Sequence, residues 1–177
     1  INLMEYFDIY DQHRKPLGII KSREEVHASG LWHWTTHVWI VNSSDELLLQ
    51  QRALTKESHP GMWDISCAGH IPAGSDSRES AVRECSEELG LQIREDELSL
   101  LCTVTQVYRL NNDTFIDNEF CDVFLLRKDI DISSLTMQEE EVAQVRWMHW
   151  QELERSLKEA PELFVPHPRE YLRLFGY

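Results

Sequence analysis

One stretch of the chain, residues 76–89, carries both a start and a stop signal for an α-helix. Asp76 is a favourable N-cap and Glu79 follows it by three residues, while Gly90 is the residue type that ends helices in a left-handed conformation. Apolar residues recur at helical spacing between these signals, so one side of the helix is predicted to pack on a core. Strand-like runs flank the helix on both sides, which predicts a layered domain of helices and sheet.

The rest of the chain consists of short runs with strand spacing, separated by turn residues. We expect strands at 7–10, 17–20, 37–41, 47–51, 63–68, 98–109, 115–126 and 145–150, and further helices at 22–27, 151–159 and 168–175. Neither a repeat nor a linker divides the sequence. Residues 1–177 are therefore predicted to form a single domain that ends in a helical tail, at about 151–177.

The charge balance restricts the partners of the chain. There are 31 acidic and 17 basic residues, and the formal net charge is −14. Such a surface repels nucleic acid and anionic membranes, so neither is expected as a partner. No apolar run approaches the ~20 residues that span a bilayer. The aromatic stretch at residues 31–34 suits a core or a partner equally, so the oligomeric state stays open.

Cysteine usage and the first ten residues indicate a cellular location. The four cysteines form no CxxC pair, and each stands among apolar residues: Cys67, Cys85, Cys102 and Cys121. Buried free thiols are the expected state. The segment INLMEYFDIY contains acids and no basic leader, which is not typical of a signal peptide. A reducing compartment is expected, and a cytoplasmic protein is the prediction.

Three acids stand late in the predicted helix, at Glu84, Glu87 and Glu88. At 100° per residue they share about one third of the helix circumference. Carboxylates this close repel one another, and the helix dipole disfavours negative charge near a C-terminus. A hard divalent cation with oxygen ligands would relieve both costs. An exposed acidic face that binds nothing is the alternative interpretation of such a stripe.

The segment from Gly69 to Leu91 resembles the Nudix signature, G-x5-E-x7-R-E-U-x-E-E-x-G-U with U for an aliphatic residue. The matching positions are Gly69, Arg83, Glu84, Glu87, Glu88, Gly90 and Leu91. The sequence departs from the signature at Ser75, where the family has its first Glu, and mildly at Cys85. The resemblance implies an α/β fold, a Nudix-type α/β/α sandwich with a mixed central sheet.

The same resemblance implies a set of functional residues around that helix. Glu84, Glu87 and Glu88 would bind Mg²⁺, with Mn²⁺ as the alternative ion, and the carbonyl of Gly69 would join them. Arg83 would orient the metal carboxylates. Glu87 and Arg83 are therefore counted with the catalytic residues. The bound metal would neutralise a diphosphate and activate a water for attack on phosphorus.

Further motifs resemble isopentenyl-diphosphate isomerases and their uncharacterised relatives, over about residues 5–150. These motifs are QRALTK at 51–56, PGMW at 60–63, Gly69-His70 and DNEF at 117–120. The resemblance implies that His33 is a metal ligand on a strand, with His27 and His70 at two further histidine positions of the pattern. It also implies that Glu119 is the catalytic acid of the last motif. Taken singly, each histidine would be an ordinary polar residue.

Two basic residues follow the predicted hairpin, Arg52 and Lys56. Alone they would only solubilise its edge, but beside a metal helix they suit a cationic clamp on a diphosphate. His70 is counted with them as a substrate-binding residue. Trp63 is either a core residue or a platform for the substrate, and the substrate tail is expected over the aromatic residues Trp32, Trp34 and Trp63.

The choice between hydrolase and isomerase depends on one position. The isomerase signature places a cysteine directly before Gly-His, and here that residue is Ala68. Cys67 is adjacent, but neighbouring strand residues point to opposite faces. The sequence therefore predicts magnesium-dependent hydrolysis of a diphosphate bond in a small organic or nucleoside diphosphate, with Glu119 as general base. The alternatives are an isopentenyl-diphosphate isomerase and a non-catalytic diphosphate-binding sensor, for which Ser75 would mark lost activity.

Overall fold

The computed structural model describes residues 5–176, so residues 1–4 of the N-terminal segment and residue 177 of the predicted tail lie outside the description. The strands are β1 (Tyr6–Tyr10), β2 (Pro16–Ser22), β3 (Trp32–Val41), β4 (Glu46–Arg52), β5 (Trp63–Asp64), β6 (Cys67–His70), β7 (Leu98–Leu110), β8 (Phe115–Arg127) and β9 (Val142–His149). The helices are α1 (Arg23–Ser29), α2 (Ser77–Leu89), α3 (Trp150–Glu159) and α4 (Pro168–Leu174). Among the described residues, every helix is too short or too polar to cross a membrane.

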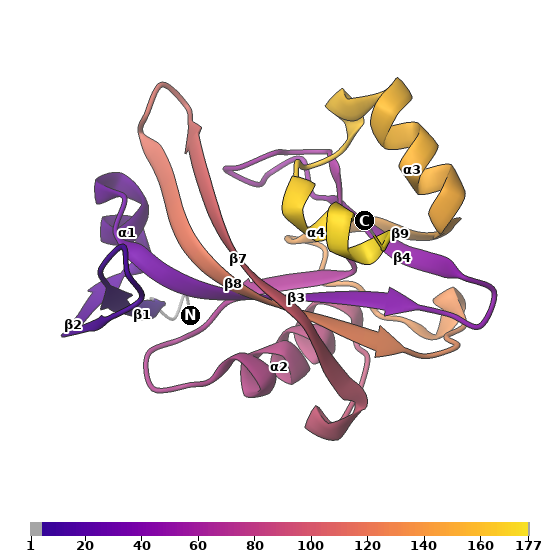
Figure 1. Cartoon of the computed structure of the whole chain (residues 1–177), viewed down its shortest axis with the longest axis horizontal. Helices are drawn as coiled ribbons and strands as arrows, with labels where there is room; N and C mark the ends of the chain where they lie inside the picture. Colours follow the sequence, from indigo (N-terminus) through magenta and orange to yellow (C-terminus); the bar gives the residue numbers. More distant parts are fainter. Residues whose placement is uncertain (1–4, 177) are drawn as a thin grey trace.

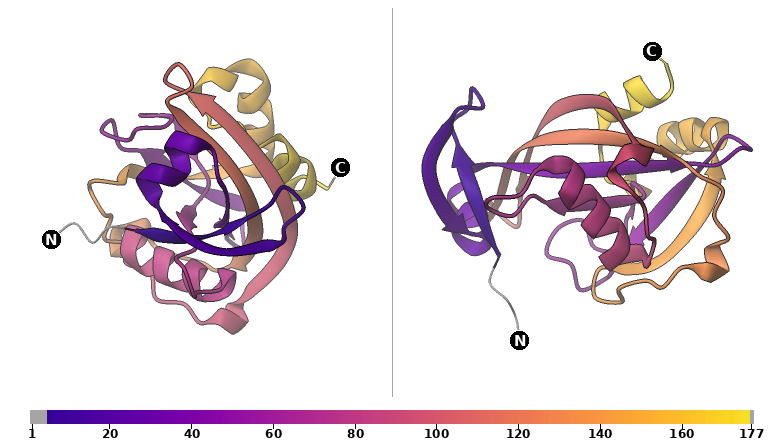
Figure 2. Two further views of the ribbon diagram at one scale, coloured as in Figure 1. Left: turned by 90° about the vertical axis from the view of Figure 1, so that its left-hand side faces the viewer. Right: turned by 90° about the horizontal axis from the view of Figure 1, so that it is seen from below.

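The strands form one mixed sheet around β3. β3 runs parallel to β8 from the Trp32–Asn118 pair onward, and antiparallel to β4 and β6. Figure 1 shows α2 on one side of this sheet and α3 and α4 on the other. The β1–β2 hairpin and α1 lie together at one end, as both views in Figure 2 also show. The predicted α/β/α sandwich with a mixed central sheet is confirmed.

Two apolar clusters join the layers. Ala81, Cys85 and Leu89 of α2 pack with Val38 and Ile40 of β3 in the first cluster, and all five are almost fully buried. The second cluster packs the opposite face of the sheet against α3 and α4, and its members include Trp39, Leu153 and Tyr171. The period of two along β3 separates the clusters, because Val38 and Trp39 point to opposite faces.

The same alternation builds a polar row on β3. His33, Thr35 and His37 share the face of Trp39 and are all buried. β8 places Glu119 directly beside His33 in the parallel register. Trp32 lies on the other face, where its ring stacks on Phe120 with centroids 4.8 Å apart. Buried polar side chains in the middle of a sheet need hydrogen-bond or ion-pair partners, and here these partners come from elements that are distant in sequence.

The helix start and stop signals are confirmed, whereas one strand prediction is wrong. Asp76 caps α2 by accepting from the amide of Glu79, and Gly90 ends the helix at a φ of 65°. The single strand predicted at 63–68 is instead two strands. β5 pairs with β4 and β6 pairs with β3, so the chain changes neighbours between Asp64 and Cys67.

Gly90→Ala is expected to lower the free energy of unfolding by about 2 kcal/mol, because an L-residue is strained at positive φ. The new Cβ would also lie 3.1 Å from backbone atoms of Thr136. Gly74→Ala is the matched control, since Gly74 has a φ of +83° and nothing within 4 Å of the added Cβ. Urea unfolding should therefore show a smaller loss for Gly74→Ala. Equal losses would mean that the contact with Thr136 contributes nothing.

Candidate active site

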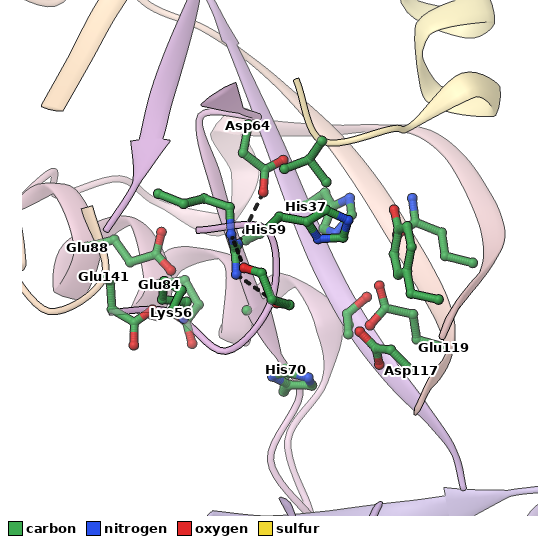
Figure 3. A pocket seen from close by; sticks show the side chains of 18 of the residues that line it. His37, Lys56, His59, Asp64, His70, Glu84, Glu88, Asp117, Glu119 and Glu141 are labelled. Carbon is green, nitrogen blue, oxygen red and sulfur yellow. Dashed lines mark hydrogen bonds and ion pairs between the residues drawn. The ribbon is translucent and has the colours of Figure 1, made fainter. Parts of the chain in front are cut away.

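A cavity of about 190 Å³ opens between the C-terminal half of α2, the polar row of β3 and the loop after β4. Figure 3 shows Glu84 and Glu88 on one side of the cavity, Asp117 and Glu119 on the other, and His37 between them. The cavity therefore has two acidic ends. The predicted metal residues divide between these ends rather than forming one cluster.

The first end is built on a close approach of α2 to Gly69. A Cβ added at Gly69 would lie 2.3 Å from Cδ of Glu84, so only glycine leaves room for that carboxylate. Arg83 contacts Glu84 at 3.0 Å, and its other terminal nitrogen lies 3.9 Å from Glu87. Glu87 stands at the rim with half of its side chain exposed. The absence of a side chain at Gly69 thus creates the space in which the carboxylate of Glu84 lies.

Glu88 completes this end at the bottom of the cavity. Its Oε2 accepts a hydrogen bond from Nε2 of Gln50 at 2.9 Å and one from Sγ of Cys67 at 3.5 Å. Burial raises the pKa of Glu88 to about 7, and burial together with the charge of Glu88 raises the pKa of Glu84 to about 9. Crowded oxygen ligands that resist ionisation in the absence of a cation are suited to a hard divalent ion. The donor set therefore fits magnesium.

Ser75, the departure from the signature, lies in the loop before α2. Its amide donates to the carbonyl of Pro72 at 3.0 Å, so a backbone hydrogen bond closes this turn. Asp76 follows immediately and caps the helix. The loop that leads into α2 is therefore held by backbone and capping hydrogen bonds, with Ser75 where the signature described above has a glutamate.

The second end is a cluster of His27, His33, His70 and Asp117, whose ligand atoms all lie within 4.8 Å of one another. Nε2 of each histidine and Oδ1 of Asp117 are buried without a hydrogen-bond partner. Oδ1 of Asp117 lies 3.2 Å from Nε2 of His33 and 3.4 Å from Nε2 of His27. Converging buried atoms without partners are typical of a ligand-binding site, and three imidazoles with one carboxylate suit a transition metal.

The electrostatics of this cluster agree with such a ligand. Burial and the nearby His33 lower the pKa of His70 well below its ordinary value, so its ring is neutral and able to bind a metal. Burial and the charge of Asp117 raise the pKa of Glu119 well above its ordinary value. Glu119 lies 3.8 Å from Nε2 of His33. His33 and His70 belong to this second end, and His70 borders the first end because it follows Gly69, which lies against Glu84.

The predicted phosphate clamp lies along the same cavity, but both cations are already paired. Arg52 contacts Oδ2 of Asp64 at 3.3 Å and donates to the carbonyl and hydroxyl oxygens of Ser58, both at 3.0 Å. Lys56 forms an ion pair with Glu141. A bound phosphate would therefore compete with these carboxylates for the two cations.

The aromatic platform is not assembled at this cavity. Trp63 does not line it, and instead packs against the second apolar cluster with the guanidinium of Arg146 5.8 Å above its ring. Trp32 and Trp34 belong to the face of β3 opposite the polar row, near Phe120. The prediction placed Trp32 and Trp34 at the same site as His33, although alternation along β3 points these side chains to opposite faces of the sheet.

The residue before Gly69, where the isomerase signature has a cysteine, is Ala68. Ala68 lines the cavity and pairs with His37 across β6 and β3. Cys67 points to the other face, where it is fully buried in the cluster with Cys85. Within the described chain, no cysteine lines the cavity.

Sequence reasoning missed several cavity residues. His37 on β3, Gln106 and Tyr108 on β7, and His167 near the C-terminus all line it. No local motif marks them, because a histidine in a buried strand and a glutamine in an edge strand have ordinary structural uses. Only the pairing of β7 with β8 and the return of the tail across the sheet bring them together.

Comparison of the sequence with known proteins identifies relatives over most of this chain. Residues 31–175 match the NUDIX domain model. Nudix hydrolase 3 of Arabidopsis thaliana is 40% identical over 97% of this chain, although the chain spans only 23% of that protein. Isopentenyl-diphosphate Delta-isomerase of Salmonella heidelberg is 28% identical over 92% of this chain and 87% of its own length.

The fold has solved relatives as well. DR0079 from Deinococcus radiodurans superposes with a TM-score of 0.68 at 17% identity, covering 97% of this chain and 98% of its own. At that identity the likeness concerns the fold alone. The match to the domain model covers most of the sequence and includes all of α2. The chain therefore belongs to the Nudix family, in the branch whose relatives include both Nudix hydrolases and isopentenyl-diphosphate isomerases.

Proposed function

We propose that this protein is a magnesium-dependent hydrolase that cleaves the diphosphate bond of a small organic or nucleoside diphosphate. The observation that carries the proposal is the arrangement of one cavity. The three carboxylates of α2 line the cavity on the side of Gly69. Two cations line the same space, Arg52 at the end of β4 and Lys56 in the loop that follows. Acids that hold a divalent ion opposite cations that hold phosphate are the parts that phosphoryl chemistry needs.

Each of these residues has a stated role. Glu84, Glu87 and Glu88, with the carbonyl of Gly69, would hold Mg²⁺ or Mn²⁺. The bound ion supplies charge neutralisation and a water of lowered pKa. Arg83 keeps the carboxylates of Glu84 and Glu87 in place through its two contacts.

The substrate side of the cavity is assigned in the same way. Arg52 and Lys56 bind the phosphates, and His70 lies at the boundary with the second end. Glu119, buried and with a raised pKa, is suited to hold or accept a proton at the far end. A cavity of about 190 Å³ accommodates a diphosphate and the atoms next to it, so a larger substrate group would extend outward. The net charge of −14 favours a small-molecule substrate over nucleic acid or membrane, and the cysteine usage favours the cytoplasm.

A true isomerase is the second candidate, because the cluster of His27, His33, His70 and Asp117 lies beside Glu119. Ala68 in place of a thiol counts against it. Incubation with isopentenyl diphosphate separates the two candidates: phosphate release detected by ³¹P NMR supports hydrolysis. Dimethylallyl diphosphate formed without phosphate would contradict it.

The substrate class is best sought by a ³¹P NMR screen with Mg²⁺ that detects both inorganic phosphate, released from a terminal diphosphate, and phosphomonoesters, released from a diphosphate bridge such as that of ADP-ribose. Isopentenyl diphosphate, nucleoside diphosphates and ADP-ribose represent the main classes, and Glu87→Gln serves as the blank. The expected result is formation of one of these products that EDTA abolishes and added Mg²⁺ restores. Tight binding of a diphosphate in calorimetry, without turnover at any divalent metal, would instead identify a sensor.

Gly69→Ala is expected to reduce turnover by at least about tenfold while changing stability by no more than about 1 kcal/mol. The added Cβ meets only the far end of Glu84, a flexible side chain that can rotate away at low cost. That rotation removes a carboxylate from the metal site. Urea unfolding and turnover measured on the same sample check the prediction. Unchanged turnover would show that Glu84 does not need its position beside Gly69.

A further inference from the structure

The C-terminal helix α4 places a carboxylate beneath the polar row of β3. Oε1 of Glu170 accepts hydrogen bonds from Nδ1 of His37 at 2.9 Å and Nε1 of Trp39 at 3.4 Å. Oε2 accepts from Nε2 of Gln106 at 2.7 Å and lies 3.1 Å from Nδ1 of His167. Three hydrogen-bond donors and the ring of His167 therefore surround this carboxylate. Although His37, His167 and Glu170 are close enough to enclose a cation, Glu170 already contacts both rings, and its evident use is to orient these partners.

The second ring nitrogen of His37 remains uncommitted. Within residues 5–176, Nδ1 contacts Glu170 while Nε2 has no hydrogen-bond partner. The two nitrogens of an imidazole point in widely different directions, so fixing Nδ1 on Glu170 directs Nε2 away from α4. The ring lines the cavity, and Figure 3 shows it between the two acidic ends. His37 pairs with Ala68, the residue before Gly69, and lines the same cavity as the α2 carboxylates.

Nε2 of His37 differs from the cationic groups along the cavity, because those groups already have acidic partners. Each lysine and arginine that lines it within the described chain already has an acidic partner: Arg23 with Glu5, Arg52 with Asp64, and Lys56 with Glu141. An entering phosphate must compete with a carboxylate for each of these cations. At Nε2 of His37 it would meet no competitor.

We propose that His37 donates a hydrogen bond from Nε2 to a phosphate oxygen of the bound substrate, and that Glu170 is the positioning residue of His37. The inference rests on the proposed function, because it requires a diphosphate in the cavity. Donation from both nitrogens requires the imidazolium form, in which Glu170 and the phosphate compensate the charge from opposite sides. The C-terminal helix is then part of the substrate site, although it contains none of the signature residues.

NMR of the intact wild-type chain tests this directly, with methylenediphosphonate and Mg²⁺ as the probe. The ring ¹⁵N signals of His37 are assigned by comparison with His37→Gln. The expected result is a shift of Nε2 and a slowly exchanging hydrogen on it when the probe binds. Binding in calorimetry with Nε2 of His37 unchanged would overturn this inference alone. Absence of binding at millimolar probe would overturn it together with the proposed function.

A binding cycle tests the role of Glu170. His37→Phe is expected to raise the Kd for the magnesium–methylenediphosphonate probe about tenfold or more, because a charge-assisted hydrogen bond is lost. His13→Phe is the matched control, because His13 is exposed on the β1–β2 turn and does not line the cavity.

Glu170→Gln is expected to weaken binding in the wild-type background but not in the His37→Phe background, since it acts through His37. Equal weakening in both backgrounds would overturn the positioning role. Where Glu170→Gln does not fold, the Nε2 response of the wild-type chain decides the proposal.

Discussion

Glu84→Gln is expected to lower turnover by at least about 100-fold, the loss typical of removing one group that stabilises developing charge. The same change should leave the metal-free protein at least as stable as the wild type. Glu84 is 12% exposed, lies beside Gly69 and close to Glu88, and has a pKa raised to about 9 by burial and by the charge of Glu88. A carboxyl whose pKa is raised by folding destabilises the fold increasingly as the pH rises from its unfolded pKa to its folded pKa. A neutral amide does not incur this cost at pH 7–8.

The measurement is urea unfolding with EDTA and with Mg²⁺, together with turnover. We expect Mg²⁺ to stabilise the wild type clearly and Glu84→Gln much less, since an ion that binds only the folded state adds stability by mass action. Glu79→Gln is the matched control, because Glu79 is an exposed acid on the first turn of the same helix. If the metal-free Glu84→Gln protein unfolded at a much lower urea concentration than the wild type, this would contradict the claim that the Glu84 carboxylate destabilises the metal-free fold.

Glu170→Gln is expected to cost about 3 kcal/mol of unfolding free energy, because it leaves buried partners without their counter-charge. Glu170 is fully buried and contacts His37 and His167, while Nε2 of His167 contacts Asp64 at 2.7 Å. Glu162→Gln is the control in the same tail, where the side chain is exposed. Thermal or urea unfolding should show a change within about 0.5 kcal/mol for the control.

The loss of unfolding free energy caused by Glu170→Gln should also depend on pH. Burial opposes the charged form of His167, but Glu170 and Asp64 raise its pKa to about 10. A histidine whose pKa is raised by folding contributes its full stabilisation below its pKa in the unfolded chain, about 6.5. This stabilisation is lost as the pH rises through the pKa of the folded protein. The pKa of Glu170 is lowered, against burial, by His37 and His167, so its contribution is lost in acid.

The difference between wild type and Glu170→Gln should therefore be largest near pH 6–7 and shrink above about pH 10. Unfolding series at pH 7 and pH 10.5 measure it. A difference that stays constant across this range would show that the ion pair between His167 and Glu170 does not contribute to docking of the C-terminal helix.

Much of the fold follows from local sequence because it depends on short-range signals. Asp76 and Gly90 determine the ends of α2 through cap bonds to neighbouring residues. Alternation along β3 and β6 places Cys67 in the core and Ala68 at the cavity, as a period of two requires. The same rule applied to Trp32 and Trp34 would have excluded them from the polar face.

The parts that could not be predicted depend on long-range pairing. The division of the chain between β5 and β6 follows from a change of neighbouring strand, which no local pattern marks. The convergence of His27, His33, His70 and Asp117 joins four separate elements or loops. His37 and Glu170 are 133 residues apart, and their contact depends on where the tail crosses the sheet.

The most direct test of the account is a crystal structure of the protein with Mg²⁺ and methylenediphosphonate. We expect the ion on the carboxylates of Glu84, Glu87 and Glu88, and the phosphonate groups between that ion and Arg52. Carboxylates of α2 that point into solvent without an ion, with the phosphonate bound elsewhere, would contradict the central claim.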